Sequence, residues 1–169
     1  YVRSKEKSLQ SCRLRQKIKI GVLPVDIIKN DDYMVWMTQG QVEFSDVLTP
    51  KARKKLLAAL QLEENDLQEN CPVQIVSTGH AKVIIGIKSG ERLNSMKPDL
   101  GALVALSKEI GCSGYYVFTF AETEEGFLTR GRMFAPAIGI AEDPVTGNAN
   151  GPLGAFLVRH NLVKHDNAT

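Results

Sequence analysis

The most restrictive feature of the sequence is the way its β-rich segments are joined. Residues 22–28 and 33–38 flank a polar stretch, 29–32, that suits a hairpin turn. Residues 115–120 and 127–134 repeat the pattern around an acidic loop. Because such hairpins outnumber strand–helix–strand units, the sequence predicts an α+β fold with largely antiparallel sheet and argues against a doubly wound nucleotide fold.

Two helices are predicted between these hairpins. Thr49 followed by Pro50 is typical of a helix start, and Pro98 is expected to open a second helix that ends at Gly111. The first helix carries apolar residues at helical spacing on one face, namely Ala52, Leu56, Leu57 and Leu60.

The charge of the chain is nearly balanced, with 21 basic and 19 acidic side chains among 169 residues. The basic excess lies in residues 1–20, where charges mostly alternate with aliphatic side chains over 13–20. We favour a half-buried strand over a nucleic-acid patch there. No apolar run approaches the length of a membrane span, so we expect neither nucleic acid nor membrane as a partner.

The cysteines and histidines do not form a metal-binding pattern. Cys12, Cys71 and Cys112 lie far apart, without a Cys-x-x-Cys pair, and His160 and His165 lack a third ligand. We expect no metal site, and we interpret Cys112 as a buried, unreactive thiol. The odd cysteine count and the lack of a signal-peptide pattern favour the cytoplasm.

The two ends of the sequence suggest a piece of a longer chain. The first residue is Tyr1 instead of methionine, and residues 1–9 resemble the tail of a helix that began earlier. The last residues follow a helix without a closing strand.

Residues 142–158 differ from the rest of the chain. After Asp143 no charged residue occurs until Arg159, and the stretch is rich in glycine and small polar residues. We expect a polar loop that leads into a buried helix beginning near Asn148, with Pro152 in its first turn. The buried face would carry Leu153, Phe156 and Leu157.

A helix start of this kind suits a carboxylate or phosphate. It presents backbone amides and the positive end of the helix dipole, and Gly147 permits close approach. Asp143 disfavours a highly charged phosphate, and a lysine at phosphate-loop spacing is absent. A ligand with a carboxylate and an amino or acidic C–H group fits both features. Alternatively, Asp143 and Thr146 only cap the helix; the local pattern leaves both interpretations open.

Gly79 and His80 lie at a break between two β-rich segments. A ligand-facing turn is one interpretation of this break. We favour the other, in which the histidine hydrogen-bonds within its own loop.

Several motifs resemble one known family. They are Arg-Met-Phe-Ala-Pro at 132–136, Glu-Asp-Pro-Val-Thr-Gly-Asn-Ala at 142–149, and Ser-Thr-Gly-His at 77–80. The chain resembles, over essentially its whole length, the phenazine-biosynthesis isomerase-like (PhzF-like) family, which has the diaminopimelate-epimerase fold. The resemblance implies two lobes, each a curved, mostly antiparallel sheet around a central helix, with the site between them. It also implies a homodimer without metal or cofactor.

The resemblance assigns roles to individual residues. Asp143 corresponds to an aspartate that orients the substrate, while Gly147 and Asn148 offer amides to its carboxylate. Asn148 stands where characterised phenazine enzymes have serine, which keeps the amide but leaves the substrate open. The family's general acid/base, a glutamate, and its Gly-His site motif lie upstream of the position matching Tyr1.

These observations lead to one hypothesis and one alternative. Residues 1–40 would be the remnant of the N-terminal lobe and residues 41–169 most of the C-terminal lobe, both incomplete. The parent protein would be an isomerase that transfers a proton on a small amino-acid-like or cyclic carboxylic substrate. We expect Asp143 to be catalytic, and the substrate to be bound by Thr146, Gly147, Asn148, Gly79 and His80. The piece alone would be inactive, and the alternative is a non-catalytic carboxylate-binding or interaction protein of the same fold.

Overall fold

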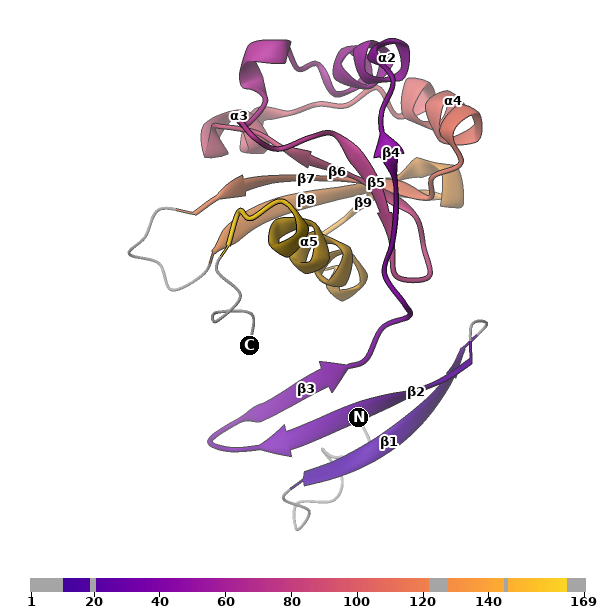
Figure 1. The fold of residues 1–169 in the computed structure, drawn as a ribbon, viewed down its shortest axis with the longest axis vertical. Helices are drawn as coiled ribbons and strands as arrows, with labels where there is room; N and C mark the ends of the chain where they lie inside the picture. Colours follow the sequence, from indigo (N-terminus) through magenta and orange to yellow (C-terminus); the bar gives the residue numbers. More distant parts are fainter. Residues whose placement is uncertain (1–10, 19–20, 122–127, 145, 164–169) are drawn as a thin grey trace. The chain divides into compact units, whose positions relative to one another are not determined.

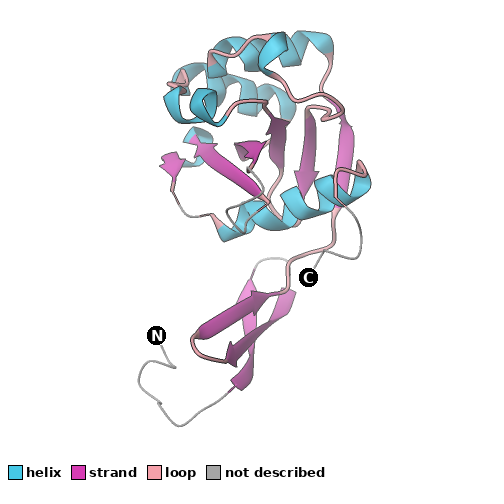
Figure 2. Cartoon of the chain, turned by 90° about the vertical axis from the view of Figure 1, so that its left-hand side faces the viewer, coloured by secondary structure: helices cyan, strands magenta, loops and turns pink. Residues whose placement is uncertain are grey.

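The computed structural model describes residues 11–18, 21–121, 128–144 and 146–163. The chain divides into two compact units, one up to Gln41 and the other from Val42 onward. Figure 1 labels the helices and strands of both units, and Figure 2 colours them by type.

The first unit is a three-stranded antiparallel sheet. Its strands, in sheet order, are β1 (Ser11–Ile18), β2 (Gly21–Lys29) and β3 (Tyr33–Met37). The predicted hairpin is therefore confirmed, with Lys29 opposite Tyr33. The strand expected before this hairpin is present as β1, but it is not half-buried within this unit, where Leu14 is 42% exposed.

The second unit is built on a six-stranded sheet. Its neighbouring strands are antiparallel except β6 and β7, which run parallel. The strands, in sheet order, are β4 (Glu43–Val47), β5 (Gln74–Ser77), β6 (Lys82–Gly86), β7 (Gly114–Phe120), β8 (Thr129–Ala135) and β9 (Ile140–Asp143). The second predicted hairpin corresponds to β7 and β8, and its acidic loop, residues 122–126, lies outside the described residues.

Helices cover both faces of this sheet. Figure 1 shows α2 (Pro50–Leu60), α3 (Gly90–Ser95) and α4 (Leu100–Ile110) on one face and α5 (Gly147–Arg159) on the other. Two short 3-10 helices, η1 (Glu64–Asp66) and η2 (Pro136–Ile138), complete the unit. The parallel pairing of β6 and β7 requires a crossover connection, which α3 and α4 provide.

Local sequence explains where α2 and α4 begin and end. The Thr49 hydroxyl accepts a hydrogen bond from the Ala52 amide at 3.3 Å, as predicted for the start of α2. The second predicted helix starts at Leu100 rather than at Pro98, because the Asp99 carboxylate caps it by accepting from the Ala102 amide. Gly111 ends α4 in the left-handed conformation, at φ 71°, as expected.

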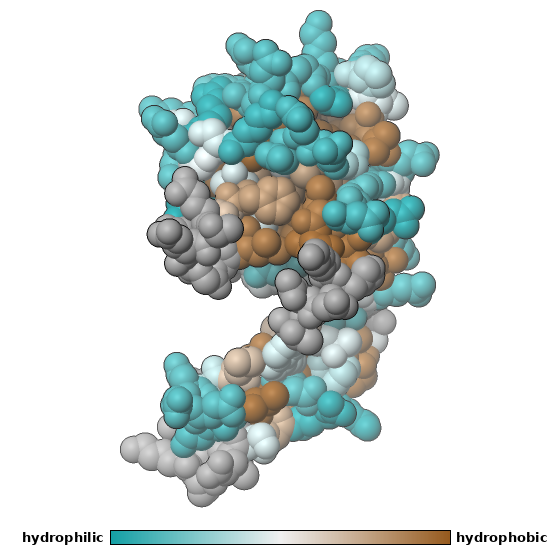
Figure 3. Space-filling model, turned by 60° about the vertical axis from the view of Figure 1, so that its left-hand side comes forward, coloured by the Kyte–Doolittle hydropathy of each residue, from teal (hydrophilic) through white to brown (hydrophobic). Residues whose placement is uncertain are grey.

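Two hydrophobic clusters fill the spaces between the layers. The cluster on the α2–α4 face includes Leu56, Leu103, Ile85 and Tyr115. The cluster on the α5 face includes Val76, Ile84, Phe118 and Phe156. Figure 3 shows hydrophilic side chains over the upper part of this unit, where α2, α3 and α4 lie, and hydrophobic ones gathered below.

Helix α5 begins at Gly147, in agreement with the expected start near Asn148. It differs from its prediction in one detail, since Pro152 lies inside the helix rather than in the first turn. Pro152 cannot donate to the carbonyl of Asn148, which sits four residues earlier. Burial of Pro152 and Phe156 against the sheet compensates, and the predicted apolar face of the helix is confirmed.

Candidate active site

The segment that leads into α5 joins an acidic residue to a helix start. Asp143 ends β9 and is half-buried, and Gly147 begins α5 four residues later. Asp143 lies opposite Met133 in the β8–β9 ladder, so the two side chains share a face of the sheet. Met133 belongs to the cluster beneath α5, which places Asp143 on the α5 face.

The preceding residue, Glu142, faces the opposite side, because side chains alternate along a strand. Arg132 donates two hydrogen bonds to its carboxylate, from Nε at 2.7 Å and from Nη2 at 2.8 Å. Arg132 Nη1 also donates to the carbonyls of Leu93 and Met96, at 2.8 and 3.0 Å. This arginine thus fastens β9 to the end of α3.

This ion pair also sets the ionisation of both partners. The Arg132 guanidinium holds the pKa of Glu142 below its ordinary value, mainly through these hydrogen bonds. Glu142 in turn raises the pKa of Arg132. The pair therefore stays charged over the whole physiological pH range.

The first turn of α5 is accessible. A Cβ atom added at Gly147 would meet no atom within 4 Å, and Asn148 is exposed. Thr146 is the N-cap residue, but its side chain makes no capping hydrogen bond. Capping by the Thr146 side chain is therefore wrong, whereas capping by Asp143 stays an open alternative.

Gly79 and His80 form the turn between β5 and β6. The Gly79 amide donates to Ser77 Oγ at 3.1 Å, and its φ of 125° is one that glycine accepts readily. The His80 side chain is exposed, while its carbonyl accepts from Lys82 Nζ at 3.2 Å. The backbone of the histidine thus takes part in its own loop.

Helix α5 connects the two groups of predicted residues. It packs against β5 and β6, the strands that the Gly79–His80 turn joins. Its last turn is fixed at the beginning of β5, where His160 Nε2 lies 2.8 Å from Gln74 Oε1. Figure 1 shows α5 along this face, with its start toward the end of the sheet where that turn lies.

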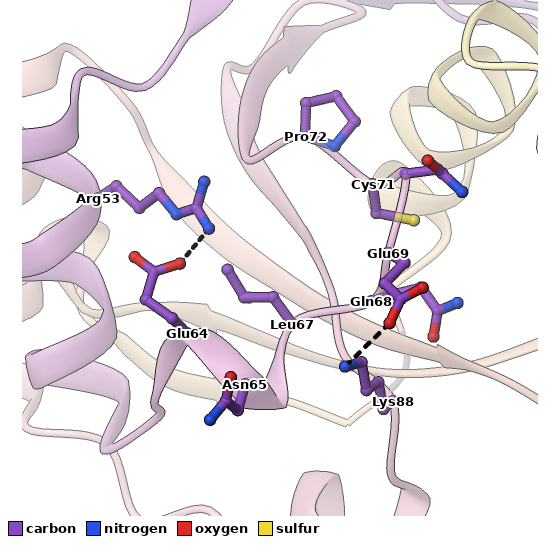
Figure 4. Close-up of a pocket in the computed structure, with 10 residues that line it drawn as sticks. Arg53, Glu64, Asn65, Leu67, Gln68, Glu69, Cys71, Pro72 and Lys88 are labelled. Atoms are coloured by element: carbon purple, nitrogen blue, oxygen red, sulfur yellow. Dashed lines mark hydrogen bonds and ion pairs between the residues drawn. The ribbon is translucent and has the colours of Figure 1, made fainter.

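A separate pocket of about 450 Å³ lies between η1 and the start of β5 (Figure 4). Arg53 pairs with Glu64 on one side of it, and Lys88 lies 3.5 Å from Glu69 on the other. Cys71 lines the pocket, and burial raises the pKa of its thiol to about 11. None of the predicted site residues lines this pocket, and its charges already neutralise one another.

Two properties of the described residues concern metal binding and membrane insertion. Within the described ranges, no group of three or more His, Cys, Asp or Glu side chains could hold a metal ion. Among the helices of those residues, none has the length and apolar character needed to cross a bilayer.

The sheet with helices on both faces, and with a helix start beside a strand-end acid, is the diaminopimelate-epimerase-like fold. A structure of a Bacillus anthracis phenazine biosynthesis protein of the PhzF family superposes on 94% of this chain and 54% of its own, with a TM-score of 0.78 and 30% identity. The family model described as phenazine biosynthesis-like protein matches residues 1–169. The chain belongs to this PhzC-PhzF family.

Two curated relatives of the chain are named as isomerases. It is 55% identical over 169 residues to an uncharacterized isomerase of Clostridium acetobutylicum, covering 99% of this chain and 56% of the relative. It is 34% identical over 155 residues to the trans-2,3-dihydro-3-hydroxyanthranilate isomerase of Pseudomonas aeruginosa, covering 90% and 50%. The chain thus spans about half the length of these relatives.

A single sequence gives little sign of two further residues. Arg132 belongs to a recognisable motif, but nothing in one sequence reveals that it reaches the carbonyls of Leu93 and Met96 at the end of α3. A lysine at a strand start, such as Lys82, is ordinarily exposed. The available clue is its position directly before the apolar residues 83–85.

Proposed function

We propose that the whole protein containing this chain is an isomerase that moves a proton within a small amino-acid-like or cyclic carboxylic substrate. The observation that supports this most is the short connection between Asp143 and the accessible start of α5. An acid and a set of first-turn amides in one segment suit a ligand with a carboxylate and a cationic or acidic centre.

Each predicted residue has a role in this proposal. The amides at Gly147 and Asn148 hold the substrate carboxylate, since the space at Gly147 is open. Asp143 orients the substrate through its amino group. Thr146, whose side chain does not cap α5, and the exposed turn at His80, with Gly79 beside it, line the same site.

The proposed reaction breaks one C–H bond and forms another. A base removes a proton from an acidic carbon and returns it to a different carbon of the same molecule, so substrate and product have equal composition. The resemblance assigns this proton transfer to a glutamate upstream of the position matching Tyr1. The Pseudomonas relative is named for a cyclic amino acid of this class, and we propose the class rather than that compound.

The assembly is part of the same proposal. Residues 1–40 belong to an N-terminal lobe and residues 41–169 to a C-terminal lobe. The protein acts as a cytoplasmic homodimer without a cofactor. The homodimer and the absence of a cofactor follow from the family resemblance. The mass of the purified, active protein tests the first, and its metal content tests the second.

The test is deuterium incorporation from heavy water into a panel of amino-acid-like carboxylates, using the whole protein. Wild type should exchange one carbon-bound proton of its substrate, and Asp143→Asn should abolish this exchange while the thermal midpoint stays the same. Asp46→Asn, at an exposed position in β4, is the matched control and should exchange as wild type does. Unchanged exchange in Asp143→Asn contradicts the role of Asp143.

The second candidate function is carboxylate binding without turnover. It is favoured by the accessible start of α5, because helix-start amides suit an anion whether or not a reaction follows. Saturable binding of a panel compound, without any solvent exchange in the whole protein, would establish this alternative and exclude the isomerase.

A further inference from the structure

Lys82 is a buried charge on an apolar face of the sheet. It is the first residue of β6 and is 4% exposed. In the ladders it lies opposite Val76 and beside Gly114. Val76 and Ile84, two positions further along β6, belong to the cluster beneath α5, so Lys82 projects into that layer.

The partners of this ammonium group are few. Among the described residues, the acceptor found for Lys82 Nζ is the carbonyl of His80, at 3.2 Å. An ammonium group has three N–H donors, so one neutral acceptor leaves most of its capacity for another ligand. Burial is the cause that lowers the pKa of Lys82, and no acidic side chain of the described residues counteracts it.

A second positive feature near Lys82 raises the free-energy cost of burying its ammonium group without a counter-charge among the described residues. Helix α5 starts toward the same end of β5 and β6, and a helix start carries partial positive charge. Two positive features on one face repel each other in a poorly solvated layer. Buried charges are retained in proteins when they are paired, so this arrangement calls for an anion.

The basic residues of the pocket in Figure 4 differ from Lys82 in having carboxylate partners. In the pocket of Figure 4, Arg53 and Lys88 each have a carboxylate partner. Lys82 differs because its surroundings are apolar side chains and one carbonyl.

We propose that Lys82 is an anion-binding residue of the candidate site, which receives the carboxylate of the ligand at the turn formed by residues 77–80. This inference rests on the proposed function for the identity of the ligand as a small carboxylate. It adds a residue that donates a charge-assisted hydrogen bond, and it makes the β5–β6 turn a carboxylate-binding element.

The test uses acetate as the probe and the whole protein labelled with 15N. Sodium acetate is titrated against sodium chloride at equal ionic strength, and the amide signals of Gly79 and His80 are followed by NMR. In wild type, acetate should shift both signals in a saturable way. Lys82→Met should weaken acetate binding about ten- to hundredfold, the range for a charge-assisted hydrogen bond.

Two variants control for charge and folding. Lys88→Met removes the same charge from an exposed position just after β6, and it should bind acetate as wild type does. Lys82→Met should keep or raise the thermal midpoint, because an apolar side chain replaces a buried charge. Lys82→Arg keeps the charge and should retain binding within a few-fold.

Two outcomes overturn the inference. One is acetate binding by Lys82→Met that equals wild type, and the other is an absence of saturable shifts in wild type. If Lys82→Met fails to fold, the 15Nζ signal of Lys82 in wild type decides, since it must move with acetate. Deuterium exchange is measured separately from acetate binding. If acetate binding requires Lys82 but no substrate exchanges deuterium, the isomerase proposal is rejected and the inference about Lys82 stands.

Discussion

Arg132 donates two hydrogen bonds, of 2.7 and 2.8 Å, to the carboxylate of Glu142, which is the residue directly before Asp143. The same guanidinium donates to the carbonyls of Leu93 and Met96. Because Glu142 and Asp143 point to opposite faces of β9, the pair holds the strand from one side and leaves Asp143 on the other. The position of Asp143 is therefore held through the ion pair of the neighbouring Glu142.

Glu142→Gln tests this relationship through the pH dependence of stability. Arg132 lowers the pKa of Glu142 from its ordinary value of 4.5, so its stabilising contribution is complete above that value. The contribution is lost as pH falls from 4.5 through the lower folded-state pKa. We expect the variant to be less stable than wild type by about 1 kcal/mol at pH 7, and the difference to shrink below pH 4.5 in urea unfolding.

Glu142→Gln should also weaken carboxylate binding, because Asp143 is no longer held through its neighbour, and Glu109→Gln is the matched control for this binding measurement. Glu109 pairs with Lys55 at 2.5 Å, but both side chains are exposed and join two helices away from β9. This variant should leave ligand binding unchanged. Equal binding in Glu142→Gln and Glu109→Gln would refute the positioning of Asp143 by Arg132.

Gly147→Ala separates folding from binding at the start of α5. An added Cβ meets no atom within 4 Å, so the variant should fold at least as stably as wild type. The methyl group would stand where the ligand carboxylate approaches the helix. We expect about tenfold weaker carboxylate binding, the loss of roughly one good hydrogen bond, as measured by calorimetry in the whole protein.

Gly154→Ala is the control within the same helix. Its added Cβ also meets no atom within 4 Å, and it lies seven positions further along α5. It should raise stability by up to about 1 kcal/mol, because alanine is the better helix former, and leave binding unchanged. Weaker binding in both variants would indicate a general effect on α5 instead of a local one.

The sequence predicted elements best where one local signal decided them. The hairpin turn before Tyr33, the cap at Thr49 and the left-handed Gly111 are each set by a few neighbouring atoms. Pro152 was expected in the first turn of α5 but lies inside the helix. Packing against the sheet decides this detail, and a single sequence carries little information about such packing.

The candidate site could be predicted in part for the same reason. The residues from Asp143 to Asn148 are close in sequence, so their proximity needed no fold. The roles of Arg132 and Lys82 depend on strand register and on contacts across many residues, such as that of Arg132 with Leu93. The short helix α3, which makes this contact, was not predicted because six residues give too weak a periodic signal.

The environment of His160, at the C-terminal end of α5, predicts a second pH dependence of stability. Gln74 Nε2 donates to the Ser45 carbonyl at 2.6 Å, so Gln74 Oε1 is the acceptor and His160 carries its proton on Nε2. Burial and the charge of Arg159 lower the pKa of His160 below its ordinary 6.5. Stability is therefore complete above pH 6.5 and falls as pH drops from there through the folded-state pKa.

His160→Gln should remove this dependence. An amide does not titrate, so its free energy of unfolding should stay flat between pH 7 and 5, while that of wild type declines. The comparison by chemical denaturation at several pH values checks the sign. A wild-type protein that gains stability on acidification over this range would contradict the assigned environment of His160.

The two units are expected to unfold separately in the 169-residue chain. Both hydrophobic clusters consist of residues from the second unit, whereas the described sheet of the first unit leaves Val35 and Met37 more than half exposed. A three-stranded sheet without a covered face is marginally stable. The lone tryptophan, Trp36, lies in β3 and reports on the first unit alone.

In urea, the fluorescence of Trp36 should therefore change at a lower concentration than the far-ultraviolet circular dichroism, which the second unit dominates. Deletion of residues 1–41 should leave the circular dichroism transition in place. Coincident transitions from both probes would show instead that the two units fold as one cooperative body.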